Sequence, residues 1–331
     1  MRFAFLAALS VSFSTAAATA ETGLTSGAAP WRAAIERADY RAARTLAEGP
    51  AAQGDAPANV ALGLMYEKGL GVRPDIGAAL VHYSAAAVKG SADAQLALGR
   101  IAVEGAGVYP DFERAAGWFR LAAAGGDPRA DVRLGLMLAD GIGVRKDLIA
   151  AASHFAKAAA KGDRDGLFYL GFAFMNGDGV PQNYAGAAKY FADAADKGQA
   201  EAAYHLALLH DSPVLGGADA RAAARYMAMA AAGGHAPAFA AMGLIVHRGD
   251  AAGVAADWFE KGARAGDPQS SLLYAVALSK GDGRPKDVAA AVDVASRLAL
   301  TASAPAPIRA QAERLVRTLT AQIAGPLTLR D

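Results

Sequence analysis

The chain has 331 residues, of which 53% are hydrophobic and 20% are charged, a balance typical of folded and not of disordered proteins. Its 33 basic residues nearly equal its 32 acidic ones, so it lacks the positive charge with which proteins bind nucleic acid or an anionic membrane surface. No cysteine is present, which excludes disulfides. Much of the hydrophobic fraction is alanine, a strong helix former, and the composition therefore predicts an all-α protein.

Residues 1–20 have the pattern of a secretory signal. Arg2 lies beside the amino terminus, an apolar run follows, and the segment ends in Ala18-Thr19-Ala20. A membrane anchor or a first core helix is the alternative, but the apolar run is shorter than the ~20 residues that a bilayer span needs. We therefore expect cleavage after Ala20 and an exported protein, periplasmic in a Gram-negative cell or otherwise secreted, with no membrane span after cleavage.

A repeat of 36 residues follows. A Leu-Gly pair or its equivalent recurs at this step, and so do a glycine between units and an Asp or Asn within them. The pairs begin at Leu62, Leu98, Leu134, Leu170, Leu206 and Met242; the glycines are Gly54, Gly90, Gly126, Gly162, Gly198 and Gly234; the Asp or Asn residues are Asp39, Asp75, Asp111, Asp147, Asn183 and Asp219. Three series in the same register predict an array of identical structural units.

Each unit is predicted to be a pair of helices. A first helix such as residues 58–68 ends at a glycine suited to a left-handed cap, and an Asp or Asn then caps the second helix. The second helix keeps alanines in register and an aromatic residue one turn further on, which we expect to fill the gap between units. Lys89, Lys161 and Lys197 come in its last turn, where a cation suits the helix dipole.

The glycine-rich turns could also suggest a phosphate-binding loop. Gly69-Leu70-Gly71 is followed by Val72, and the same GxGV pattern recurs from Gly105, Gly141 and Gly177. A phosphate site needs one such loop at the start of a helix, whereas these turns follow helix ends, where carbonyl groups repel phosphate. The pattern therefore favours punctuation between helices, and we expect no cofactor.

The units differ at the two ends of the array. Residues 31–57 are predicted to form an incomplete amino-terminal capping repeat, residues 58–269 six repeats, and residues 270–304 a degenerate seventh. In residues 305–331 we expect a carboxy-terminal capping helix and tail, with apolar residues at 308, 312, 315, 316, 319 and 323 on one helix face. A docking element for a partner is the alternative for this helix.

The sequence contains no recognisable catalytic or metal-binding motif. His82 and His154 occupy equivalent repeat positions, which indicates a shared packing slot. His205 and His210 are five residues apart, so they do not form a metal-binding pair on one helix face. We therefore expect a protein that is not an enzyme. The sequence leaves open whether carboxylates from different helices approach each other as a catalytic pair.

A binding surface is predicted from the positions that vary between equivalent units. Those equivalent to Ala61 and Lys68 change freely and share a helix face, and units four and five add a high density of aromatic residues and methionine. The candidate binding residues are Arg133, Phe168, Tyr169, Phe172, Met175, Asn176, Tyr204, His205 and Leu208. They could form the floor of a groove for a peptide or helix; ordinary core filling is the alternative.

The repeat resembles the Sel-one-like repeat family. The residues that carry the resemblance run from Ala58 through Leu62-Gly63, Tyr66, Gly69, Gly71-Val72, Asp75, Ala79, Tyr83 and Ala86-Ala87 to Gly90. The resemblance implies antiparallel helix pairs stacked as in tetratricopeptide proteins, an α/α superhelix or solenoid, with an inner surface that binds proteins. It also implies an adaptor role in envelope signalling, secretion or surface polysaccharide assembly. The alternative is an enzyme or a glycan-binding module that uses the groove for cell-wall material or glycans.

Overall fold

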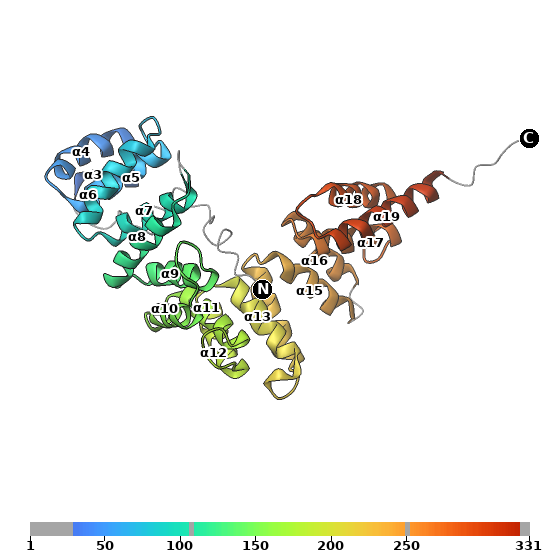
Figure 1. Ribbon diagram of the computed structural model, residues 1–331. Coiled ribbons are helices and arrows are strands. Elements are labelled where there is room, and N and C mark those ends of the chain that lie inside the picture. Colours follow the sequence, from blue (N-terminus) through green and yellow to red (C-terminus); the bar gives the residue numbers. More distant parts are fainter. Residues whose placement is uncertain (1–28, 106–108, 249–251, 325–331) are drawn as a thin grey trace, which may run out of the picture. The chain divides into compact units, whose positions relative to one another are not determined.

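The computed structural model describes residues 29–105, 109–248 and 252–324 (Figure 1). Within these ranges the regular structure consists of seventeen α-helices and one short 3-10 helix, with no strand. The predicted all-α class and the pairing of helices in a 36-residue repeat are confirmed. The predicted signal at residues 1–20 lies outside the described residues. None of the described helices has both the length and the apolarity needed to cross a membrane.

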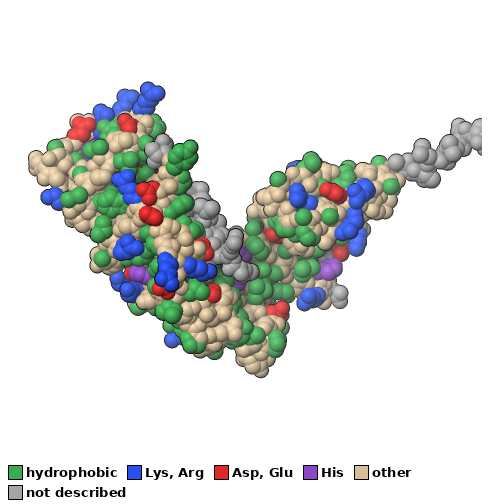
Figure 2. All heavy atoms as spheres, viewed as in Figure 1, with side chains coloured by type: hydrophobic (Ala, Val, Ile, Leu, Met, Phe, Trp, Pro, Cys, Tyr) green, Lys and Arg blue, Asp and Glu red, His purple; other side chains and the backbone are tan. Residues whose placement is uncertain are grey.

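The helices divide into two compact units, which meet in sequence between Asn183 and Tyr184 and are described separately. The first unit contains α3 (Pro30–Glu36), α4 (Tyr40–Ala52), α5 (Ala56–Lys68), α6 (Ile76–Val88), α7 (Ala92–Glu104), α8 (Phe112–Ala124), α9 (Pro128–Asp140), α10 (Leu148–Ala160) and α11 (Arg164–Asn176). The second contains α12 (Tyr184–Asp196), α13 (Ala200–Asp211), η1 (Pro213–Leu215), α14 (Ala220–Ala232), α15 (Ala236–Arg248), α16 (Ala252–Arg264), α17 (Pro268–Lys280), α18 (Val288–Leu300) and α19 (Ala306–Ala324). On the face drawn in Figure 2, acidic and basic side chains are interspersed on both.

Five of the predicted caps begin the second helix of their hairpin. Asp75 Oδ1 accepts a hydrogen bond from the amide of Ala78 at 3.0 Å, and Asp147 Oδ1 accepts one from Ala150 at 2.9 Å. Asp39, Asp111 and Asp219 cap their helices in the same way. Because each cap satisfies an amide that the helix leaves unpaired, the helix starts are fixed by local chemistry.

The two glycines of the turn after α5 have different roles. Gly69 has φ of 71° and ends the helix, with its amide donating to the carbonyl of Met65. Gly71 has φ of 68°, and a β-carbon placed on it would lie 2.7 Å from the carbonyl carbon of Tyr40, at the start of α4. The turn thus lies at the carboxyl end of a helix and packs against the preceding hairpin, as expected of punctuation between helices.

The core of four hairpins is an aromatic ring packed on a glycine. Tyr83, Phe119 and Phe155 of the second helices are 2%, 1% and 2% exposed. A β-carbon on Gly135 in α9 would lie 2.5 Å from Cε1 of Phe155 in α10. The ring of Phe155 also stacks on Tyr169 of the next hairpin, with 5.3 Å between centroids. The aromatic residues therefore fill the gap between units, as predicted, and also hold together the two helices of one hairpin.

One of the predicted lysines connects two successive hairpins. Lys161 directly follows α10, and its Nζ donates a hydrogen bond of 2.5 Å to the carbonyl oxygen of Gly126 in the loop before α9. The helix dipole was the predicted reason for a cation at this position. The structure adds a second reason, a bond between the closing turns of two adjacent repeats.

Helix α19 packs against the last hairpin of the second unit. Ala312 and Leu319 are buried there, and Ile308 and Leu315 are partly buried against α17 and α18. Ile323, which the sequence places on the same apolar face, is 62% exposed. The packed part of that face therefore ends at Leu319.

We predict that Gly135→Ala lowers the free energy of unfolding by about 1–3 kcal/mol, because the added methyl group overlaps the ring of Phe155. Gly117→Ala is the matched control. Gly117 lies in the middle of α8, and a β-carbon placed on it would meet no atom within 4 Å, and replacing a helix glycine by alanine stabilises by up to about 1 kcal/mol. Urea unfolding followed by circular dichroism measures both; equal effects of the two substitutions would contradict the packing described above.

Candidate interaction surface

The predicted binding residues of the first unit are partly surface and partly core. Arg133 on α9 and Tyr169 and Met175 on α11 are half-buried, and Asn176 is exposed. Phe168 and Phe172 are only 3% and 8% exposed and pack edge to face, with 4.9 Å between their centroids. For these two rings the burial favours the core-filling alternative, since a partner cannot touch them without displacing the side chains above. They support the surface and do not form its floor.

The accessible residues of this set are held by neighbours in the first unit. Tyr169 lies edge to face with Phe168 at 5.1 Å and stacks on Phe155. Asn176 Nδ2 donates to Asp178 Oδ2 at 3.1 Å, and the carbonyl of Met175 accepts from Gln182 Nε2 at 2.9 Å. The end of α11 and its turn thus present polar groups with fixed positions.

In the second unit, Tyr204 and His205 lie in a cluster of rings, and Leu208 is 41% exposed. His205 is 5.5 Å from Tyr204 and 5.8 Å from Phe191 between centroids, and Tyr204 is 4.7 Å from His235. Burial, with a smaller contribution from His235, lowers the pKa of His205 to about 4. Burial also lowers the pKa of His235, although Asp267 opposes this. Both histidines are therefore neutral at neutral pH.

His82, His154 and His210 have packing roles. His82 and His154, predicted to share a packing slot, are both half-buried and both have a polar partner on the first helix of their hairpin. His82 Nδ1 is 3.0 Å from Asn59 Oδ1, and His154 Nδ1 is 2.8 Å from Asp131 Oδ1. His210 stacks on Tyr226. In the part of the chain that the structure describes, no three His, Cys, Asp or Glu side chains are grouped so that they could hold a metal ion.

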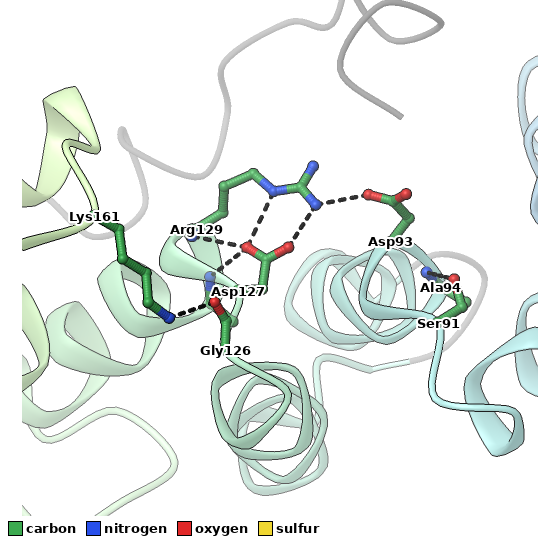
Figure 3. A network of polar contacts seen from close by, with 8 residues as sticks. Ser91, Asp93, Ala94, Gly126, Asp127, Arg129 and Lys161 are labelled. Carbon is green, nitrogen blue, oxygen red and sulfur yellow. Dashed lines mark hydrogen bonds and ion pairs between the residues drawn. The ribbon is translucent and has the colours of Figure 1, made fainter. Parts of the chain in front are cut away.

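A polar network at the starts of α7 and α9 was missed by the sequence analysis (Figure 3). Arg129 Nη2 donates to Asp93 Oδ1 and to Asp127 Oδ2, each at 2.6 Å, while Asp127 also caps α9. Asp93 and Arg129 are 36 residues apart, so a search for opposite charges one repeat apart could have found them. Arg129 thus connects two adjacent repeats at the starts of their first helices.

Two further arginines bridge carboxylates in the same way. Arg100 donates to Glu67 at 2.5 Å and to Glu104 at 2.9 Å, and Glu67 also accepts from the Tyr83 hydroxyl at 3.0 Å. In the second unit, Arg284 donates to Asp257 at 2.7 Å and also contacts Glu260. We call Arg100, Arg129 and Arg284 the bridging arginines.

The bridging arginines determine what their carboxylates can do. Burial alone would raise the pKa of Glu67, but the charge of Arg100 and the bonds from Lys68 and Tyr83 hold that pKa below its ordinary value. Burial also raises the pKa of Asp127, but the hydrogen bonds and charge of Arg129 lower it, so this pKa too lies below its ordinary value. A glycosidase-type pair needs one carboxyl group that keeps its proton. Glu67 and Asp127 do not meet this requirement, and their clusters fit a structural role.

The pKa of His205 gives a prediction for stability against pH. The folded-state value of about 4 lies below the ordinary 6.5, so the unfolded chain takes up a proton first as the pH falls. The contribution of neutral His205 to the free energy of unfolding is therefore complete above the ordinary pKa and is lost as the pH falls toward 4. At about pH 5 the loss should be on the order of 2 kcal/mol.

His205→Gln should flatten the stability profile between about pH 4 and 6.5, whatever its effect at neutral pH, because the glutamine does not titrate there. The control is His247→Gln, since His247 is 47% exposed. Denaturant unfolding at several pH values measures the slope. An unchanged slope in His205→Gln would show that this histidine is not held neutral in the folded protein.

Comparisons with known proteins agree with this architecture. A family model described as Sel1 repeat matches seven segments of the chain: residues 56–91, 92–127, 128–163, 164–199, 200–235, 252–267 and 268–293. Among curated proteins none matches this chain.

Several solved structures are similar to the chain. A Sel1 repeat protein from Oxalobacter formigenes is 29% identical, with a TM-score of 0.58, and the match covers 62% of this chain and 85% of that one. A protective antigen of uropathogenic Escherichia coli with an SLR fold is 23% identical, with a TM-score of 0.46, over 85% of this chain and 79% of that one. An immunity protein of Pseudomonas aeruginosa is 19% identical, with a TM-score of 0.40, over 66% of this chain and 81% of that one.

Proposed function

Because this chain belongs to the Sel1 repeat family, we propose that it is an exported scaffold that binds protein partners in the cell envelope and catalyses no reaction. The observation that carries the proposal is the contrast between a constant frame and variable positions. Caps, glycines and aromatic rings repeat with little change, whereas equivalent positions on the first helices hold Ala61, Arg133, Tyr169 and His205. Variation on a constant frame is typical of repeat proteins that recognise partners.

Export is supported by the signal pattern of residues 1–20. A mature protein that begins at Glu21 would act in the periplasm of a Gram-negative cell, or outside the cell. The adaptor role implied by the family resemblance, in envelope signalling, secretion or exopolysaccharide regulation, suits this location. The partner is then a protein or peptide that is itself exported or that faces the same compartment.

A binding role without turnover is supported by the bridging arginines. An enzyme that acts on cell-wall or glycan material would need a protonated carboxyl group beside an ionised one. The clusters around Arg100 and Arg129 instead contain carboxylates, Glu67 and Asp127, whose pKa is held low. The alternative of a glycan-active enzyme therefore gains nothing from these acidic pairs.

The test is cross-linking in the native compartment with tagged full-length protein, followed by mass spectrometry. We expect the recovered protein to begin at Glu21 and to carry a defined set of partners. Arg133→Glu with Asn176→Lys should remove at least one partner, because both positions are on the candidate surface of the first unit. A charge change at one or two central contacts typically weakens a complex tenfold or more, about 1.4 kcal/mol.

The matched control makes the same changes of charge on the other helix of the same region. Lys157→Glu with Ser153→Lys alters two exposed residues of α10 and should leave recovery unchanged. Recovery of every partner by both double variants would refute the surface of the first unit. A retained segment 1–20 would refute cleavage after Ala20, and recovery of the protein from the cytoplasm alone would refute export.

A further inference from the structure

Exposed apolar residues lie on the first helices of the second unit, and we call Leu208, Leu244 and Ile245 the strip. Leu208 in α13 is 41% exposed, and Leu244 and Ile245 in α15 are 38% and 37% exposed. Leu208 and Leu244 occupy the same repeat position, one repeat apart. In α17, Leu273 and Val276 are half-buried.

The exposure of this strip is specific to the second unit. In the first unit the same repeat position holds Leu64 and Leu136, which are 8% and 1% exposed. An apolar residue at this position is thus ordinarily part of the core. In the second unit the leucines are retained while the burial is not. Leu244 and Ile245 are adjacent in the chain and both exposed, and neighbouring exposed apolar side chains on a folded protein commonly mark a binding surface.

Helix α15 shows that the strip is a second face and not a misplaced core. Its core face consists of Ala238, Ala240, Met242 and Gly243, all buried. Ala241, Leu244, Ile245 and Arg248 follow the spacing i, i+3, i+4, i+7 and therefore lie together on another face. This face is apolar along its length and ends in a positive charge.

The positive charge continues on the neighbouring helix. Lys280 occupies in α17 the place that Arg248 has in α15, and both side chains are exposed. Among the described residues, neither takes part in an ion pair within 4.0 Å, although Lys68 at the equivalent position of α5 pairs with Glu67 at 2.5 Å. The carboxylate of Asp282, two residues after Lys280, lies 3.8 Å from the ring of His247 and forms no ion pair with Lys280 within 4.0 Å. The helix dipole favours a cation at these helix ends but provides no counter-charge.

From this arrangement we propose that the strip Leu208, Leu244 and Ile245, with Arg248 and Lys280 at its edge, binds a protein segment in which apolar side chains are followed by acidic ones. The inference rests on the proposed binding role and names the chemistry of one partner. Apolar side chains of the segment would cover the strip, and its carboxylates would pair with the two cations. The complementary charge fixes the direction in which the segment lies.

The test uses the purified full-length protein and a phage-displayed library of random peptides of about 16 residues, long enough for about four helical turns. We expect selection of peptides with two or more apolar residues followed by Asp or Glu. Leu244→Ser with Ile245→Ser should weaken the selected peptides tenfold or more. Val254→Ser, a control at a residue of α16 that is 51% exposed, should not, and circular dichroism should show both variants folded.

Reversing the charges distinguishes recognition from general stickiness. Arg248→Glu with Lys280→Glu should change the selected consensus from acidic to basic after the apolar residues. An unchanged consensus, a consensus without charge, or equal weakening by Val254→Ser would overturn the inference. So would self-association through the strip, seen as a dimer by light scattering that Leu244→Ser with Ile245→Ser abolishes. Selection of no peptide, together with partners recovered in the native compartment through Arg133 and Asn176, would overturn the inference and leave the scaffold proposal standing.

Discussion

In four of the hairpins the ring of the second helix lies on the backbone of the first, at a position where a hydrogen atom is the largest side chain that leaves room. Gly135 and Phe155 show the contact most clearly. The two helices approach closely there, and the alanines on either side extend the same close packing along the interface. Helices of thirteen residues such as α9 and α10 are marginal alone in water, so this contact is what makes one repeat a stable unit on which a neighbour can stack.

Neighbouring hairpins are then joined by polar bonds that differ from one junction to the next. Lys161 reaches the carbonyl of Gly126, and Arg129 reaches Asp93. At other junctions a buried amide has this role: Asn59 donates to the carbonyl of Ala51, and Gln95 to that of Ala87. The apolar frame is thus nearly uniform, whereas the polar contacts give each junction its own character. The apolar frame and the polar contacts both support the binding positions on the first helices. The frame fixes each helix in place, and the bridging arginines connect it to its neighbours.

The frame could be predicted from the sequence because its determinants are local. An aspartate caps an amide three residues later, and a glycine ends a helix at its own position, so periodicity alone identifies both. The candidate site was less predictable, because accessibility depends on how far apart neighbouring helices lie. Phe168 and Phe172 match the expected composition of a groove but are core residues. Leu244 has the sequence pattern of a core residue but is exposed. The contact of Arg129 with Asp93 depends on the distance between two helices, which the repeat pattern does not specify.

The bond between Asp93 and Arg129 also bears on how such an array could change during evolution. Repeats of one length can be duplicated, lost or exchanged without disturbing the chain on either side, provided that every junction accepts any neighbour. The junction amides of Asn59 and Gln95 meet this condition, since each bonds to a carbonyl eight residues earlier in the chain. Asp93 does not, because its partner belongs to the following repeat. A recombination event that placed a different repeat after α7 would leave this carboxylate without its arginine, so these two repeats are expected to be inherited together and in this order.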